Sequence, residues 1–374
     1  MSQKFYIIAG EASGDLHGSN LIKALKARTP DAAYRHWGGD EMQKVAGPPV
    51  KHIRDLAFMG FLEVLMNLRT ILGNISFCKE DILQFQPDAL ILIDYPGFNM
   101  RIAKWAKSKG IRVVYYISPQ IWAWKQNRGH ALKKTVDQML VILPFEKEFY
   151  KRFDMDVTYV GHPLLDAIEN FKKENTMDTL KATYNLDERP ILAILPGSRK
   201  QEISKKLPIM LAAAKAFNDY QIIIAGAPSQ EKTFYAQFIG DHSSIQLISG
   251  ATYELLSMAN LAMVTSGTAT LETALFKVPQ VVCYKGSVLS YVIAKKLVKI
   301  DYISLVNLIM DKKVVTELIQ QECHSKNIVA ELRKLENDQP DRVSMLHQYA
   351  VLVEKLGDGG ASERAAKCIL EGMG

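Results

Sequence analysis

The chain has 374 residues, a length that predicts two domains. Its composition, 48% hydrophobic and 23% charged residues, is typical of a globular protein. Its four cysteines, Cys78, Cys283, Cys323 and Cys368, are widely spaced and form no CxxC motif, which argues against a disulfide framework or a zinc site. The net charge of +6 arises in the first 165 residues, with 22 Lys and Arg against 16 Asp and Glu. This excess fits an anionic partner, such as nucleic acid or anionic lipid, and fits a solvated surface equally well.

Apolar, β-rich segments alternate with amphipathic segments of helical length. In the first half we expect strands at 5–9, 34–37, 89–94, 112–118, 139–144 and 158–161. In the second half we expect them at 191–196, 221–225, 245–248, 261–265 and 280–284. Strands that are apolar on both faces and alternate with helices predict parallel sheets covered by helices. The run at 5–9 is too short for a signal peptide, and we expect no membrane-spanning helix.

Residues 10–18, GEASGDLHG, join the first strand to a helix. Their glycines lack the GxGxxG spacing, so an NAD or FAD enzyme is disfavoured. The loop brings Glu11, Ser13, Gly14 and Asp15 together, and we expect these residues to contact a substrate. A helix cap is the alternative role for Asp15.

Residues 58–75, FMGFLEVLMNLRTILGNI, predict a helix with one polar stripe and a broad apolar side. Two interpretations remain open, a buried core helix and a helix that lies in a bilayer interface, and the pattern alone favours the first. The apolar side includes Phe58, Phe61, Leu62, Leu65, Leu68 and Leu72.

Asp94 follows the apolar run at 89–93. Ligands of open α/β sheets bind at the carboxyl ends of the strands. Asp94 is therefore well placed to act as a general base that takes a proton from an attacking hydroxyl. The alternative is that it only caps the next helix.

The strand pattern breaks after 161–166, GHPLLD, and residues 169–187 are polar and lack strong apolar periodicity. We therefore expect two doubly wound domains, residues 1–166 and 189–343, joined by a linker at 167–188. The last segment, 344–374, is predicted to be helical with a break at 357–360, and to pack back toward the first domain.

Two segments of the second half, 195–199 (LPGSR) and 265–272 (TSGTATLE), each follow a strand and open a helix. Free N–H groups and the helix dipole favour an anion at such a position. In the first segment Gly197 shapes the turn, Ser198 is expected to cap the helix, and Arg199 offers a bidentate cation to a diphosphate. An ordinary turn with an exposed arginine is the alternative.

The segment 265–272 is the stronger signal, because its small residues let the backbone approach a ligand closely. These residues are Ser266, Gly267, Thr268 and Ala269. Glu272 lies one turn into the helix, where its carboxylate can accept both ribose hydroxyls, although helix capping is an alternative. Together the two segments predict a site for a nucleoside diphosphate sugar.

The chain also resembles, in collinear order from Phe5 to about Gln320, the lipid-A-disaccharide synthase family. The matching segments are GEASGD at 10–15, MGFLEVL at 59–65, SPQIWAWKQNR at 118–128, GHPLLD at 161–166, LPGSRKQEI at 195–203, SGTATLE at 266–272 and VVCYK at 281–285. This resemblance implies the GT-B fold, in which two doubly wound parallel-sheet α/β domains face a cleft.

The resemblance further implies an inverting glycosyltransferase of lipid A biosynthesis, part of lipopolysaccharide metabolism. Such an enzyme transfers a sugar from UDP-2,3-diacylglucosamine to the 6-hydroxyl of 2,3-diacylglucosamine 1-phosphate. The products are the β-1,6-linked disaccharide 1-phosphate and UDP. No metal or other cofactor is implied, and the expected location is cytoplasmic, peripheral on the inner membrane with its anionic surface; a homodimer is compatible with this.

By the same resemblance, Asp94 corresponds to an essential aspartate, Arg199 to an essential arginine and Glu272 to a ribose-binding glutamate. Asn307 corresponds to an asparagine at the cleft, although the family usually has proline where this chain has Val306. Because both implied substrates are lipids, the apolar side of 58–75 becomes an expected membrane and acyl-chain surface.

Three other functions remain to be distinguished from this one. A UDP-sugar epimerase has the same fold and the same kind of diphosphate site, but no use for the apolar side of 58–75. A non-catalytic nucleotide-binding membrane adaptor would bind UDP without turnover. Nucleic-acid binding is supported by charge alone, since no recognition motif is present.

Overall fold

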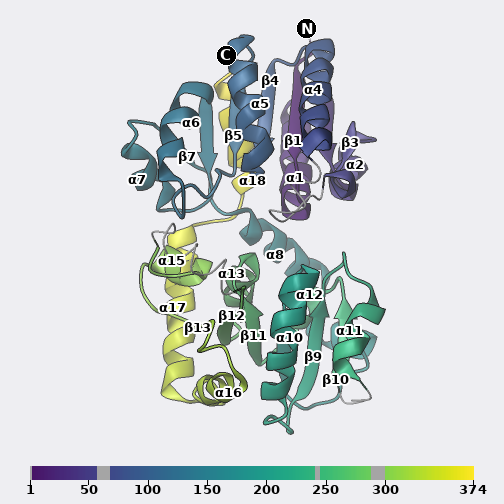
Figure 1. Ribbon diagram of the computed structural model, residues 1–374, viewed down its shortest axis with the longest axis vertical. Helices are drawn as coiled ribbons and strands as arrows, with labels where there is room; N and C mark the ends of the chain where they lie inside the picture. Colours follow the sequence, from purple (N-terminus) through teal and green to yellow (C-terminus); the bar gives the residue numbers. More distant parts are fainter. Residues whose placement is uncertain (1, 57–67, 241–244, 288–299) are drawn as a thin grey trace. The chain divides into compact units, whose positions relative to one another are not determined.

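The computed structural model describes residues 2–56, 68–240, 245–287 and 300–374. The chain forms two units, each with its own parallel sheet (Figure 1). Unit 1 comprises Met1–Pro163 and Asp358–Gly374, and unit 2 comprises Leu164–Gly357. The prediction of two doubly wound α/β sheets is therefore confirmed.

The sheet of unit 1 has seven strands in the order β3-β2-β1-β4-β5-β6-β7, and all neighbours pair in parallel. The strands are β1 (Lys4–Ala9), β2 (Ala33–Gly38), β3 (Lys51–His52), β4 (Ala89–Ile93), β5 (Val113–Tyr116), β6 (Gln138–Val141) and β7 (Thr158–Tyr159). All residues of β4 and β5 are buried, as expected for central strands covered by helices on both faces.

The helices of unit 1 include two at the chain's ends that pack against each other in its core, α1 and α18. Alanines 365 and 366 of α18 are fully buried beside Leu21 and Leu25 of α1, since small side chains let helices approach closely. The helices are α1 (Ala12–Arg28), α2 (Asp40–Ala46), α4 (Leu68–Phe85), α5 (Pro96–Ser108), α6 (Gly129–Thr135), α7 (Glu146–Lys151) and α18 (Ala361–Glu371).

The sheet of unit 2 has six strands in the order β10-β9-β8-β11-β12-β13, again all parallel. The strands are β8 (Ile191–Leu195), β9 (Gln221–Gly226), β10 (Ile245–Ser249), β11 (Leu261–Thr265), β12 (Gln280–Tyr284) and β13 (Thr316–Ile319). The helices are α8 (Pro163–Glu174), α9 (Met177–Thr183), α10 (Lys200–Ala214), α11 (Lys232–Ile239), α12 (Thr252–Met258), α13 (Thr268–Leu275), α15 (Leu305–Met310), α16 (Ser325–Arg333) and α17 (Pro340–Leu356).

The segment expected to be a linker, 167–188, is instead folded as most of α8 and all of α9. Buried Leu164 and Ile168 and half-buried Phe171 have the i, i+4, i+7 spacing of one helix face. The polar composition of the segment masked this pattern in the sequence. Phe171 and Leu180 pack in the core of unit 2, so these helices belong to that unit.

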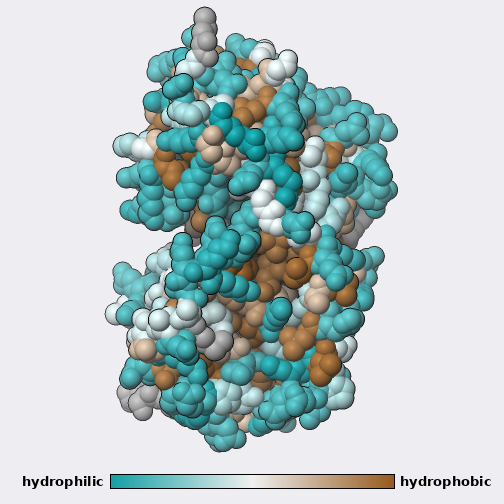
Figure 2. Space-filling view, turned by 180° about the vertical axis from the view of Figure 1, so that it is seen from behind, coloured by the Kyte–Doolittle hydropathy of each residue, from teal (hydrophilic) through white to brown (hydrophobic). Residues whose placement is uncertain are grey.

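The expected C-terminal segment, 344–374, divides between the units. The part before Gly357 lies in α17 of unit 2, whereas α18 lies in unit 1. Figure 1 shows α18, in yellow, among the early elements of the chain. Figure 2 shows that hydrophilic side chains cover most of the visible face of both units, with apolar side chains scattered on both and a larger group of them on unit 2.

Candidate functional site

In each sheet the strand order reverses beside the first strand of the unit. β1 lies between β2 and β4, and β8 lies between β9 and β11. Ligands of open α/β sheets bind outside the carboxyl ends of the strands at such a reversal. Residues 10–15 and Asp94 follow β1 and β4, while 196–199 and 266–269 follow β8 and β11. Within each unit, the fold therefore brings the two sequence-predicted segments to the same position.

In unit 1, the turn after β4 lies directly against the loop after β1. A β-carbon at Gly10 would overlap the Tyr95 ring, so only glycine permits this approach. Asp94 and Tyr95 both have left-handed backbone angles, with φ of 42° and 50°. Two buried side chains donate to the Asp94 carbonyl oxygen, the Tyr115 hydroxyl at 2.7 Å and the Asn99 amide at 2.8 Å. The Asp94 turn is thus strained, and two hydrogen bonds stabilise it.

The Asp94 carboxyl has chemistry suited to proton transfer. Burial raises its pKa to about 7, and the negative charge of Glu11 contributes in the same direction. A carboxyl with a pKa near neutrality can accept a proton and release it at physiological pH. Asp94 therefore has the properties of a general base.

The other residues of the first loop differ in how available they are. Asp15 is buried, and its carboxylate accepts N–H bonds from Gly39 at 2.6 Å, Glu41 at 2.9 Å and Met42 at 3.1 Å. It therefore caps α2, a helix other than its own. Ser13 is exposed, Gly14 is buried against β1, and Glu11 is half-buried at the N-cap of α1.

In unit 2, the loop after β8 places Arg199 at the N-cap of α10, and not Ser198 as expected. Gly197 has a φ of 114°, a conformation that favours glycine. The Arg199 side chain is 55% exposed and donates to Glu202 Oε1 at 3.2 Å. Ser198 is exposed, and its carbonyl accepts from Gln230 at 3.0 Å. The Arg199 guanidinium therefore lies at a helix N-terminus, and in the described parts of the chain it donates to Glu202 with one of its five N–H groups.

The loop after β11 passes through Gly267, whose φ is 145°, into α13. Thr268 is exposed and Ala269 is half-buried, while the Ser266 hydroxyl donates to the Ile303 carbonyl at 2.8 Å. One turn into α13, Glu272 Oε1 accepts from the Tyr253 hydroxyl at 3.2 Å. Burial raises the pKa of Glu272. Besides Oε1, the carboxyl has a second oxygen that can accept a hydrogen bond from a ligand's hydroxyl.

Asn307 is fully buried, and its amide is used within the protein. The amide nitrogen donates to the Val315 carbonyl and to Glu317 Oε1, both at 2.9 Å. The amide oxygen accepts from the N–H groups of Val314 at 2.7 Å and Val315 at 2.9 Å. An amide side chain has two donors and two main acceptor sites, so all four are occupied. Asn307 therefore shapes the loop before β13.

Sequence reasoning did not single out Tyr115, Asn99 or Lys206. Tyr115 and Asn99 act on Asp94 through its main chain, which no local motif reveals. Lys206 is 3% exposed and bonds to Thr265, the last residue of β11. Its position four residues after Glu202 on the buried side of α10 was the available signal.

Of the expected membrane surface, Phe58, Phe61, Leu62 and Leu65 lie outside the described residues, and Leu68 is the first residue of α4. Leu72 is 50% exposed on α4. Farther along the helix, Phe77 and Leu83 are also about half exposed. The described part of α4 therefore presents apolar side chains to solvent.

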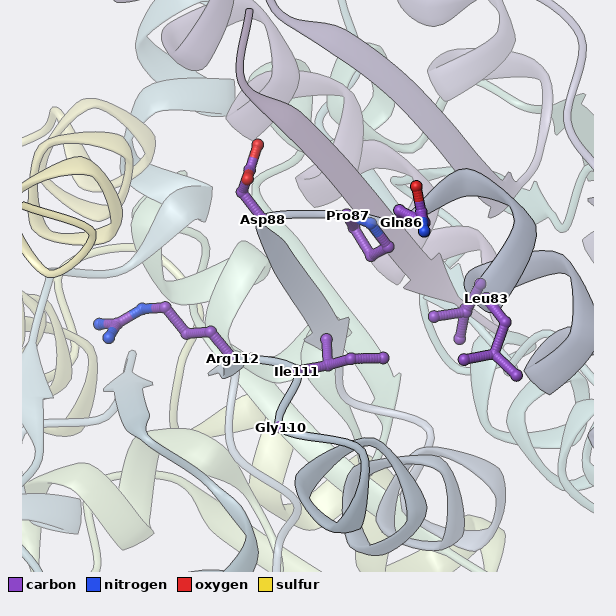
Figure 3. Close-up of a pocket in the computed structure, with 8 residues that line it drawn as sticks. Leu83, Gln86, Pro87, Asp88, Gly110, Ile111 and Arg112 are labelled. Atoms are coloured by element: carbon purple, nitrogen blue, oxygen red, sulfur yellow. The ribbon is translucent and has the colours of Figure 1, made fainter. Parts of the chain in front are cut away.

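A shallow pocket lies at the amino ends of β4 and β5, the edge opposite Asp94 (Figure 3). Leu83, Pro87, Ile111 and Arg112 are among the residues that line it, and the Arg112 side chain points away from Leu83. In the described parts of the chain, no three His, Cys, Asp or Glu side chains converge as metal ligands would. No helix among the described residues is both long and apolar enough to span a bilayer.

Solved structures at low sequence identity share this fold. The UDP-GlcNAc 2-epimerase from Neisseria meningitidis, solved bound to UDP-GlcNAc, superposes with a TM-score of 0.71 at 13% identity, over 99% of this chain and all of that one. This similarity shows the fold alone. The GT-B fold implied by the resemblance is thus confirmed.

Sequence comparison is more specific. The family model described as lipid-A-disaccharide synthetase matches residues 5–370. The lipid-A-disaccharide synthase of Syntrophus aciditrophicus is 40% identical over 98% of this chain and 96% of its own length. That of Trichlorobacter lovleyi is 37% identical over 98% and 97%. The chain therefore belongs to the lipid-A-disaccharide synthase family and is a glycosyltransferase.

Proposed function

We propose that this enzyme joins UDP-2,3-diacylglucosamine to 2,3-diacylglucosamine 1-phosphate. The products would be the β-1,6-linked lipid A disaccharide 1-phosphate and UDP. Family membership supports the reaction class. The observation that carries the proposal is the pairing of two helix N-termini and Arg199 at the strand-order reversal of unit 2, which fits a diphosphate.

The proposed mechanism is a single displacement at the anomeric carbon of the donor sugar. The acceptor 6-hydroxyl attacks from the face opposite UDP, Asp94 takes its proton, and the bond to the diphosphate oxygen breaks with its electron pair leaving on UDP. Arg199 and the N–H groups at the starts of α10 and α13 stabilise the charge that develops on UDP. Glu272 accepts the ribose hydroxyls. Inversion at the anomeric carbon gives the β-linkage.

Residues 11–14 would bind the acceptor in this proposal. They follow β1 beside Asp94, and α1 begins at Ala12, so the first-turn N–H groups lie at the carboxyl edge of the sheet. We place the acceptor sugar there. Asp15 supports this loop indirectly, through its bonds to the start of α2.

Membrane association follows from the chemistry of both substrates, which carry acyl chains. The half-exposed apolar residues of α4 and the basic excess of the first 165 residues fit a peripheral site on an anionic inner-membrane surface, reached from the cytoplasm. Flotation with liposomes tests this. Binding to anionic vesicles, but not to neutral ones, is the expected result, and recovery of all protein in the unbound fraction would contradict it.

The reaction is tested by a radiolabelled transfer assay with both lipid substrates. Arg199→Ala is expected to lower turnover by about a hundredfold or more. Arg189→Ala, an equally exposed arginine paired with Asp187 in the same unit, is the matched control and should retain turnover. Asp94→Asn is expected to abolish transfer yet bind UDP. Normal turnover in Arg199→Ala would refute the assignment.

The assay also addresses the epimerase alternative. Similarity to epimerases is at the level of fold, at 13% identity, whereas the relatives at 37–40% identity are synthases. An epimerase would convert the donor without the acceptor. No consumption of donor is expected until the acceptor is added.

A further inference from the structure

Lys206 is a buried lysine in the second turn of α10, with 3% of its surface exposed. An ammonium taken out of water is costly unless charges or acceptors nearby compensate it. Arg199 and Glu202 lie seven and four residues before Lys206, on the same side of the helix. The groups that contact Lys206 therefore explain how a buried cation is stabilised at this position.

Lys206 contacts two residues, Thr265 and Glu202, that lie next to or bond to the loops after β11 and β8. Its Nζ donates to the Thr265 hydroxyl and lies 3.9 Å from Glu202 Oε2. Thr265 ends β11, directly before the loop at 266–269. Glu202 Oε1 accepts in turn from Arg199 at 3.2 Å. A continuous polar chain thus joins the first loop to the second.

Gly197 packs over this series of polar contacts. A β-carbon at Gly197 would lie 2.6 Å from Glu202 Oε2 and 3.5 Å from Thr265 Cγ2. The backbone of the predicted diphosphate loop therefore passes directly over the carboxylate, next to the residue that holds Lys206.

The charges explain the arrangement. A carboxylate beside Arg199 repels a diphosphate and competes with it for the guanidinium. Lys206 supplies the opposite charge on the other oxygen of Glu202, which leaves the group of three with a net charge of +1. Burial lowers the pKa of Lys206, and Glu202 opposes that shift. Of the three N–H donors of this ammonium, one finds an acceptor within hydrogen-bond distance among the described residues.

Building on the proposed donor site, we propose that Lys206 is a positioning residue for the donor diphosphate. It holds and neutralises Glu202, so that Glu202 orients the Arg199 guanidinium without cancelling its charge. Without Lys206, the carboxylate competes with the diphosphate for Arg199.

Calorimetric titration of the full chain with UDP tests this proposal. Lys206→Met is expected to weaken UDP binding about tenfold. Its melting temperature should stay unchanged or rise, because replacing a buried charge by an apolar side chain is often stabilising. Lys205→Met removes the same charge from the neighbouring, exposed position and should bind UDP as the original chain does.

A second substitution separates charge balance from packing. In Lys206→Met/Glu202→Gln the competing carboxylate is gone, so UDP affinity should recover to within about threefold of the original chain. Glu202→Gln alone keeps an acceptor for Arg199 and should bind UDP more tightly. Because Glu202 is partly exposed, this variant remains informative even if Lys206→Met does not fold.

Three results would overturn the proposal: unchanged UDP affinity in Lys206→Met, no recovery in the double variant, or weaker binding in Glu202→Gln. Failure of the original chain to bind UDP is a separate outcome, because it would overturn the proposed donor site itself.

Discussion

Three residues with left-handed backbone angles lie together at the carboxyl edge of the unit 1 sheet. Asp94, Tyr95 and Ile117 all have left-handed angles, and Ile117, with a φ of 63°, is β-branched and so especially disfavoured there. Such conformations cost about 1–3 kcal/mol each and persist only where the surroundings enforce them. The Asp94 N–H donates to the Ile117 carbonyl at 3.2 Å, so the strained residues support one another. We infer that the fold keeps this strain to aim the Asp94 carboxyl.

Tyr115→Phe tests that inference, because it removes only the hydroxyl that bonds to the Asp94 carbonyl. A lost hydrogen bond is worth about 0.5–1.5 kcal/mol, so kcat should fall up to about tenfold while UDP affinity stays the same. Tyr116→Phe removes a hydroxyl from the opposite face of the same strand and serves as the control. Equal transfer rates in the two variants would show that Tyr115 does not position Asp94.

The titration of Asp94 predicts the pH dependence of transfer. A base must be ionised to act, and the Asp94 pKa is raised to about 7 by burial and then by Glu11. Below pH 7, kcat/KM should therefore rise about tenfold per pH unit, and above it the profile should level. Glu11→Gln removes the second cause, so its midpoint should move to lower pH. Glu41→Gln, which changes a partly exposed glutamate of α2, is the control. A midpoint shared by the original chain and both variants would count against the assignment.

At the scale of elements, two strand–loop–helix junctions of unit 2 depend on glycine for different reasons. Gly197 has a φ of 114° and also faces Glu202, whereas Gly267 has a φ of 145° and no atom within 4 Å of an added β-carbon. Alanine at Gly267 therefore adds strain alone, and alanine at Gly197 adds strain and a steric conflict.

Substitution by alanine at either position is expected to destabilise unit 2 by about 1–3 kcal/mol and to weaken UDP binding, with the larger effect at Gly197. Gly240→Ala is the control, since Gly240 also has a positive φ and open space but lies after α11, outside both loops. Urea unfolding and UDP titration measure the two effects. Loss of UDP affinity in Gly240→Ala would mean that general strain, and not loop geometry, controls binding.

Strands with continuous apolar runs were predictable from the sequence, and each of the expected strands is present. β3 and β13 were missed because one has two residues and the other, TELI, is half polar. The expected end of β5 at residue 118 was wrong, since the left-handed Ile117 follows its last residue, Tyr116.

The loops of the candidate site were predictable because a strand–glycine–helix junction is a local signal. The roles of Asp15 and Asn307 were not, since their partners are set by tertiary packing. Asp15 caps a helix 25 residues farther along the chain, and Asn307 bonds across a loop to Glu317. Sequence motifs thus predicted the loops of the candidate site but not which of their side chains bond within the protein.

At the scale of the whole molecule, unit 1 is built from both ends of the chain. Ala361, Ala365 and Ile369 are buried on one side of α18, which packs against α1. Arg364 fastens the start of this helix by donating to three carbonyls, those of Val160 at 2.8 Å, Asp358 at 2.9 Å and Gly359 at 2.6 Å. The last 17 residues therefore complete the core of the unit that contains Asp94.

Arg364→Ala is expected to lower the free energy of unfolding of unit 1 by about 1–3 kcal/mol, because three backbone carbonyls lose a charged donor. Hydrogen exchange should increase in peptides from α1 and α18 and stay unchanged in β8 and β11, since each unit has its own core. Lys367→Ala removes the same charge from an exposed position of α18 and is the control. UDP affinity should be retained while transfer falls, because the proposed UDP site lies in unit 2 and Asp94 in unit 1. Faster exchange spread equally over both units would show that α18 stabilises the molecule as one cooperative body.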